Sequence, residues 1–141
     1  MIGGPGRHYR DAACRAALLV VACVTLGAAV PVPDWLKPER VDVTLRNFAF
    51  APSELRLRAG HVYQLHFANV GSGGHDFTAP DFFRAANIRD GDRPGVAGGK
   101  VSLRKGEVRD VLLVPAAGTY PLKCGHFLHA SLGMTGMIVV E

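Results

Sequence analysis

The sequence lacks most of the features that mark an unusual class of protein. Its 141 residues are 48% hydrophobic and 20% charged. These values are typical of a globular chain and exclude extensive disorder or a fibrous fold. No internal repeat is visible, and strands do not alternate with helices as they do in parallel α/β folds. A chain of this length supports one domain of ordinary size.

An excess of one charge is also missing outside the N-terminal segment. The net charge is +4, but three basic residues, Arg7, Arg10 and Arg15, lie within the first 15 positions. From Val30 onward the chain holds 13 Lys and Arg against 11 Asp and Glu. We therefore expect no binding to nucleic acid, which would need a strongly basic domain.

The chain has no apolar run of the length that a membrane span needs. Residues 16–30 carry no formal charge, but a span requires about 20 residues. The basic start, this apolar run and the small residues 27–29 are typical of a secretory signal peptide. We predict a signal peptide over residues 1–29, cleaved near Ala29, then a proline-rich linker over residues 30–40. This arrangement predicts an exported, periplasmic protein.

Two alternatives stay open for the N-terminal segment. Residues 20–23, Val-Val-Ala-Cys, resemble a lipoprotein box, which would place a lipid on Cys23. Against this, the apolar run continues past Cys23, where lipoproteins usually become polar. The other alternative is an uncleaved anchor. Contact with a membrane is expected only in these two cases.

Cysteine is scarce, and this makes one cysteine informative. Cys14 and Cys23 lie in the N-terminal segment, so Cys124 is the only thiol of the predicted domain, residues 41–141. The domain therefore has no second cysteine for a disulfide, although exported domains commonly use them. The simplest interpretation is a buried free thiol, but the Gly, His and Met residues that follow favour a metal ligand.

Cys124, His129 and Met134 form a Cys-x4-His-x4-Met pattern of soft and borderline donors. With one more imidazole, such a set provides two nitrogens, a thiolate and a weak axial thioether, which suits copper cycling between two oxidation states. The best candidate for the fourth ligand is His75, which follows the glycine-rich stretch 71–74.

Other possible donors have simpler interpretations. His126 lies two positions from Cys124, where joint ligation is awkward, so we expect it at the surface or in a supporting role. Met137 competes with Met134 for the axial position, but we expect Met137 in the core of the last strand. His61 and His66 fall at a turn and on a polar strand face, and we expect both to be structural or exposed.

These motifs resemble the copper-binding segments of the cupredoxins, the plastocyanin/azurin superfamily of blue copper proteins. The matching residues are Gly118-x-Tyr120-x-x-x-Cys124, His129 and Gly133-Met134-x-Gly136, and, upstream, Asn69-x-Gly71 before His75-x-Phe77. The resemblance covers roughly residues 41–141. It implies one type 1 copper ion held by His75, Cys124, His129 and Met134.

The sequence departs from the family at two positions. Family members often place Asn directly after the first histidine and Ser or Thr directly after the cysteine, which links the two loops. Here the positions hold Asp76 and Gly125. We therefore expect that side-chain link to be absent, although the backbone N–H of Asp76 could still donate to the Cys124 sulfur.

Short alternating segments bounded by turn residues predict an all-β fold. Strands are expected at residues 41–46, 54–58, 62–67, 100–104, 108–114, 120–124 and 137–140, with 48–50 extending the first. Residues 80–88 are the best helical candidate, and residues 90–99 read as a surface loop. We expect a Greek-key β-sandwich (cupredoxin-like) of about eight strands, with one short helix after the first histidine ligand.

The predicted site favours a small exported electron carrier over an enzyme. Four ligands leave no vacant position for a substrate, and outer-sphere transfer between Cu(I) and Cu(II) needs none. Multicopper oxidases, the enzyme relatives, place histidines on both sides of the cysteine, whereas Lys123 and Gly125 flank Cys124 here. A cytochrome or oxidoreductase is expected to dock briefly on an apolar patch around His129, formed by Leu128, Ala130 and Leu132.

Two other functions stay open. The same four donors would serve a periplasmic copper-delivery protein that binds and releases the ion without redox turnover. A metal-free sandwich used for protein contacts is the third interpretation, and the presence of all four donors argues against it.

Overall fold

The computed structural model describes residue 3 and residues 32–126 and 132–141, and all structural statements concern these residues. The predicted signal peptide, Cys23 and the loop residues Leu128, His129 and Ala130 lie outside them. The strands all belong to one compact unit, Pro31–Glu141. No helix among the described residues is long and apolar enough to cross a membrane.

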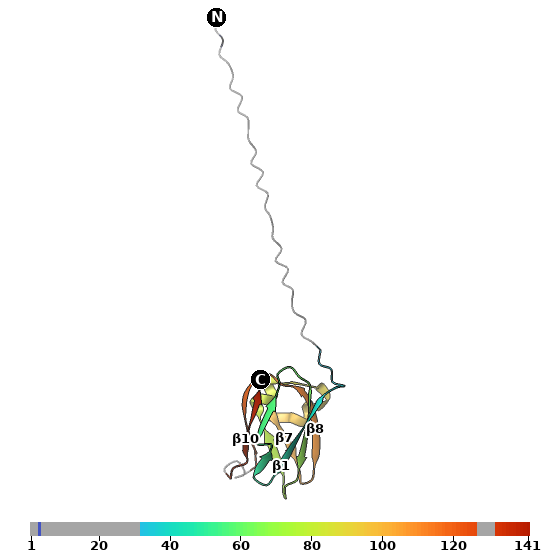
Figure 1. Ribbon diagram of the computed structural model, residues 1–141, viewed down its shortest axis with the longest axis vertical. Helices are drawn as coiled ribbons and strands as arrows, with labels where there is room; N and C mark the ends of the chain where they lie inside the picture. Colours follow the sequence, from blue (N-terminus) through green and yellow to red (C-terminus); the bar gives the residue numbers. More distant parts are fainter. Residues whose placement is uncertain (1–2, 4–31, 127–131) are drawn as a thin grey trace. The chain divides into compact units, whose positions relative to one another are not determined.

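The described residues form ten strands in two five-stranded sheets (Figure 1). The first sheet has the order β2-β1-β4-β8-β6, with bounds Ala49–Ala51, Glu39–Arg46, Tyr63–Asn69, Val108–Val114 and Asn87–Ile88. The second has the order β3-β10-β9-β5-β7, with bounds Glu54–Leu57, Thr135–Val140, Gly118–Lys123, His75–Thr78 and Lys100–Leu103. Helix α1 (Pro80–Ala85) and the 3₁₀ turns η1 (Asp90–Gly99) connect β5 to β7 through β6.

Most neighbouring strands are antiparallel, but β1 pairs with β4 and β3 with β10 in parallel. Strand β4 shows the predicted period of two: Tyr63, Leu65 and Phe67 are buried, whereas Gln64 and His66 are half-buried. His66 faces the neighbouring strand β8, where its Nδ1 lies 2.7 Å from Asp110 Oδ1. His66 is therefore structural, as expected.

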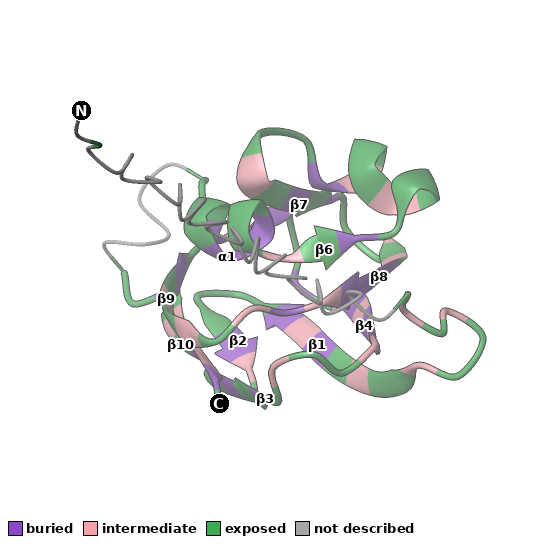
Figure 2. Cartoon of the chain, turned by 90° about the horizontal axis from the view of Figure 1, so that it is seen from above, coloured by how far each residue is buried: buried purple, intermediate pink, exposed green. Residues whose placement is uncertain are grey.

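The core lies between the sheets and is built from the inward side chains of both. Phe67 of β4 and Phe77 of β5 lie with ring centroids 4.8 Å apart, and Phe82 and Phe83 add the inner side of α1. Figure 2 shows the buried stretches in purple on the strands. Aliphatic residues from β1, β8 and β10 complete the core. This apolar interior gives the domain its main driving force for folding.

The structure confirms the all-β sandwich with one short helix, but several boundaries differ. Strand β1 begins at Glu39, inside the predicted linker. Helix α1 ends at Ala85 because Ala86 is extended, and residues 87–88 add an edge strand. The predicted loop 90–99 contains 3₁₀ turns. His75 opens a strand instead of lying in a loop, because its segment pairs with β7.

Met137 is a further correction. We expected it in the core, but 38% of it is exposed, whereas Ile138 and Val140 are buried. Strand β10 begins two residues earlier than predicted, and side chains alternate between faces along it. Since Ile138 and Val140 point inward, Met137 must point outward.

Candidate metal centre

The loop before His75 is fixed by one buried side chain, that of Asn69. Its Nδ2 donates to the carbonyl oxygens of Gly73, Leu103 and Arg104 at 2.9–3.1 Å, and its Oδ1 accepts from the N–H of Gly71. Asn69 therefore ties the glycine-rich loop to the β7–β8 turn. Because a buried amide with all these partners is costly to disrupt, the loop holds one conformation.

The side chain of Asn47, which lies in the turn after β1, orients the ring of His75. Asn47 Oδ1 lies 3.4 Å from His75 Nε2 and also accepts from the backbone N–H of Ser72 at 2.9 Å. An acceptor at Nε2 favours the tautomer that carries its proton there. Nδ1 is then the nitrogen without a proton, and it lies on the side of the ring that faces Cys124 Sγ.

Gly71 is required for this arrangement. A Cβ at this position would contact His75 Nε2 and would lie 2.8 Å from Asn47 Oδ1. Any side chain at residue 71 would therefore push the imidazole or the Asn47 amide out of place. The imidazole itself is 1% exposed.

Cys124 follows the end of β9 and lies against His75. Its Sγ is 4.0 Å from His75 Nδ1, and the residue is 2% exposed. The backbone N–H of Asp76 donates to the same sulfur at 3.4 Å, as the sequence predicted. His75 and Cys124 are 49 positions apart in the sequence, and the pairing of β5 with β9 brings them together.

Met134 is fully buried, and its carbonyl oxygen accepts the N–H of Cys124 at 3.0 Å. The two ends of the segment from Cys124 to Met134 are thus joined. His129 lies between them, outside the described residues. The described residues alone contain no group of three or more His, Cys, Asp or Glu placed to hold a metal ion. The structure therefore places two of the four predicted donors side by side and the Met134 backbone beside Cys124.

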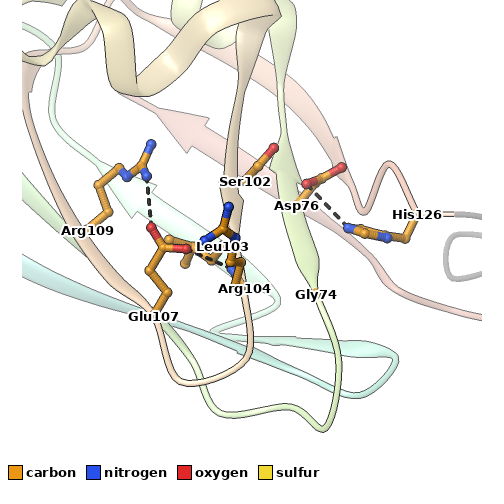
Figure 3. A pocket seen from close by; sticks show the side chains of 8 residues that line it. All are labelled: Gly74, Asp76, Ser102, Leu103, Arg104, Glu107, Arg109 and His126. Atoms are coloured by element: carbon orange, nitrogen blue, oxygen red, sulfur yellow. Dashed lines mark hydrogen bonds and ion pairs between the residues drawn. The ribbon is translucent and has the colours of Figure 1, made fainter.

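Gly125 has no side chain that could make the family's link to residue 76, as expected, but a different side-chain pair joins the two segments. His126 Nε2 lies 3.6 Å from Asp76 Oδ1, and Lys100 Nζ lies 3.6 Å from Asp76 Oδ2. Figure 3 shows the Asp76 carboxylate directed toward the His126 ring. A Cβ on Gly125 would lie 2.8 Å from Asp76 Oδ2. Gly125 thus leaves space for the carboxylate that makes the link.

Neither Asn47 nor the side chain of Asp76 was expected to have a role at the site. An Asn in a turn has many ordinary uses, so no local signal marks Asn47 as a partner of His75. Asp76 stands where the family often has Asn, and this difference could have indicated a new partner. That partner, His126, lies 50 positions away, so the sequence did not identify it. His126 is half-exposed, as expected, and His61 is exposed.

The residues present fit a copper ion. Two donors that share an ion lie about 3–4.5 Å apart, because metal–nitrogen and metal–sulfur bonds are about 2.0 and 2.3 Å long in zinc sites, for example. The separation of Nδ1 from Sγ falls in this range. Thiolate, imidazole and thioether together select copper over harder ions.

Comparison with known proteins supports the fold. No protein-family profile and no curated protein matches the sequence. Among solved structures, the reduced auracyanin of Roseiflexus castenholzii is similar with a TM-score of 0.55 at 17% identity, covering 72% of this chain and 96% of that one. Auracyanin A, a "blue" copper protein of Chloroflexus aurantiacus, gives 0.54 at 21%, with 74% and 100% covered.

A multicopper oxidase of Campylobacter jejuni is also similar, with a TM-score of 0.57 at 13% identity. The match covers 82% of this chain but 32% of the oxidase, so the chain resembles one part of that enzyme. The described sandwich, with His75 and Cys124 adjacent in it, has the cupredoxin fold, as the copper-loop motif predicted.

Proposed function

We propose that the chain is an exported electron carrier that holds one type 1 copper ion through His75, Cys124, His129 and Met134. The single observation that carries this proposal is the approach of Cys124 Sγ to His75 Nδ1 in the buried interior, with the Asp76 N–H donating to the same sulfur. When bound, copper supplies one-electron chemistry by alternating between Cu(I) and Cu(II).

The residues of the chain would keep the site unchanged between the two oxidation states. Asn69 and Asn47 hold His75 in place, and the Asp76 N–H stabilises negative charge on the Cys124 sulfur. Because these groups are fixed before an electron arrives, little rearrangement is needed on transfer. In the proposal the electron enters from one redox protein and leaves to another, and no bond of a substrate is made or broken.

Several features of the sequence favour a carrier over an oxidase. Lys123 and Gly125 flank Cys124, so neither neighbour can bridge to a second copper cluster. A transient redox partner would dock over His129, on the apolar patch that includes the exposed Leu132. Export rests on the signal-like pattern of residues 1–29.

Copper delivery without redox turnover is the second candidate. The observation in its favour is His126, a half-exposed imidazole whose ring centroid lies 6.5 Å from that of His75. An imidazole beside the site could accept an ion on its way in or out.

Voltammetry and a chelator challenge on the copper-loaded protein separate the two functions. An electron carrier gives a reversible one-electron wave and fast self-exchange, and keeps its copper when a modest chelator is added. Rapid transfer of copper to the chelator, without a reversible wave, would favour delivery and contradict the carrier.

A further inference from the structure

The charges of the domain are paired almost everywhere except around the candidate metal centre. All Asp and Glu side chains of the described residues except Asp34 lie within 4.0 Å of an Arg, Lys or His nitrogen. Five Lys and Arg side chains of the described residues have no such carboxylate: Lys37, Arg46, Arg104, Lys105 and Lys123. Four of them lie at the strand ends and in the turn next to the site, and we call Arg46, Arg104, Lys105 and Lys123 the basic rim.

Each residue of the basic rim is exposed and lies beside a group that positions a donor. Arg46 directly precedes Asn47, which contacts His75. Arg104 and Lys105 form the β7–β8 turn, which Asn69 holds against the His75 loop. Lys123 directly precedes Cys124.

The acidic groups close to the rim are already neutralised. The backbone N–H of Arg104 and the guanidinium of Arg109 both donate to Glu107, and in that order they keep the pKa of Glu107 below its usual value. Asp76 lies between Lys100 and His126. Figure 3 shows the Glu107–Arg109 pair and the Asp76–His126 pair in one hollow, with Arg104 on its wall. Residues 127–131, Phe-Leu-His-Ala-Ser, contain no carboxylate.

Exposed apolar side chains lie within the same group of loops. Phe48 follows Asn47 in the turn after β1, the N–H of Val70 donates to the Leu45 carbonyl at the end of β1, and Leu132 precedes Met134. The same end of the domain thus carries both exposed apolar side chains and the basic rim. Such a surface favours brief contact with a protein of complementary shape and opposite charge.

We propose that the basic rim selects a redox partner whose docking face is acidic. This inference rests on the proposed function and adds the chemistry of the partner. Unpaired surface charge steers encounters and raises association rates by about 10–10³-fold at low salt. The paired charges elsewhere on the domain contribute little to the attraction of an acidic protein. The basic rim therefore directs that protein to the end of the domain where His75 and Cys124 lie.

Oxidation of the Cu(I) protein by two small probes of opposite charge tests the proposal. Hexacyanoferrate(III) is the anionic oxidant and tris(phenanthroline)cobalt(III) the cationic one, and second-order rates are measured by stopped flow. Raising ionic strength from about 0.01 to 0.15 M shortens the Debye length from about 30 to 8 Å. We expect the rate with the anion to fall and the rate with the cation to rise.

Neutralising variants assign the effect to the rim. The triple variant R46Q/R104Q/K105Q should lower the low-salt rate with hexacyanoferrate about tenfold and remove most of its salt dependence. Lys37→Gln is the matched control, because Lys37 is the fifth unpaired cation and precedes the opposite end of β1. It should leave the rate within about twofold. Equal effects of K37Q and of a single rim variant would overturn the proposal.

A measurement on the metal-free protein separates this inference from the proposed function. Hexacyanochromate(III) is an inert paramagnetic anion, and it should broaden amide signals of residues 46, 104, 105 and 123 selectively. Broadening spread evenly over the surface would overturn the basic rim even if the copper site is real. Broadening at the rim with no reversible copper redox wave would instead reject the electron carrier. Binding of the apo-protein to phosphatidylglycerol vesicles through the rim, with no preference for the anionic oxidant, would assign this surface to a membrane and overturn the protein partner.

Discussion

The two loops that supply the predicted donors are held in different ways. The His75 loop is fixed by side chains, because Asn69 bonds three carbonyl groups and Asn47 reaches the imidazole. The Cys124 segment is fixed mainly by backbone groups: the Cys124 N–H to the Met134 carbonyl and the Asp76 N–H to the sulfur. The His75 half of the site therefore depends on particular side chains, whereas the Cys124 half depends mainly on backbone contacts. This difference predicts which substitutions disable the site and which only adjust it.

The largest effect is expected from Cys124→Ser, which removes the donor on which both loops converge. The substitution should abolish thiolate-to-copper charge-transfer absorption, because serine is not a thiolate. The free energy of unfolding of the metal-free protein should change by only about 1 kcal/mol, since both residues are small. Visible absorption and thermal melts of the apo-protein measure the two effects. If the variant keeps the intense band, the band does not come from the Cys124 thiolate, and the assignment of this ligand is contradicted.

Gly71→Ala should displace the His75 imidazole and leave the position of Cys124 unchanged. A methyl group at residue 71 collides with the imidazole and with Asn47 Oδ1. We expect copper affinity to fall about 10–100-fold, the usual cost of losing the support of a ligating histidine. Gly73→Ala is the control, because a Cβ there meets nothing within 4 Å. Competition titration with a copper chelator gives the affinities. Equal affinities for the two variants would contradict the claim that residue 71 must be glycine.

Asn69→Ala should weaken the fold as well as the site. It leaves three carbonyl oxygens without the donor that they share and removes the acceptor of the Gly71 N–H. We expect a loss of about 2–4 kcal/mol in the free energy of unfolding, measured by denaturant titration of the apo-protein. Asn87→Ala at an exposed position should change it by less than about 0.5 kcal/mol. A small effect at Asn69 would mean that the His75 loop is not held by this side chain.

His126→Ala should have the smallest effect, because it removes a half-exposed imidazole from the buried Asp76, which keeps Lys100 as a partner. Partly exposed ion pairs contribute about 0–1 kcal/mol, so unfolding should hardly change. The copper band should persist with a modest shift in wavelength or potential. Complete loss of colour in this variant would instead make His126 a ligand and contradict the assignment of His129.

The sandwich could be predicted because its signal is local in the sequence; the donor pattern is local too, and it stays a prediction. Cys124, His129 and Met134 lie within eleven positions, and alternation in segments such as 63–67 reports which face is buried. Contacts between residues far apart in the chain produce no local sequence pattern from which they could be predicted. Asn47 meets His75 across 28 positions, and His126 meets Asp76 across 50.

Strand boundaries were the other source of error. The glycine-rich stretch before His75 concealed the start of β5, which is defined by pairing with β7 and not by its own composition. At Met137 the hydrophobic side chain suggested the core, but the period of two in β10 turns this residue outward. Register decides the face of a strand residue, and register is set by the partner strand.

The central claim is that one copper ion joins the thiolate of Cys124 to the imidazole of His75. Titrating the purified apo-protein with Cu(II) while recording its visible spectrum tests this claim most directly. The account predicts an intense blue or green band that rises linearly and stops at one copper per chain. A protein that stays colourless under oxidising conditions, or whose colour continues to grow well beyond one equivalent, would contradict it.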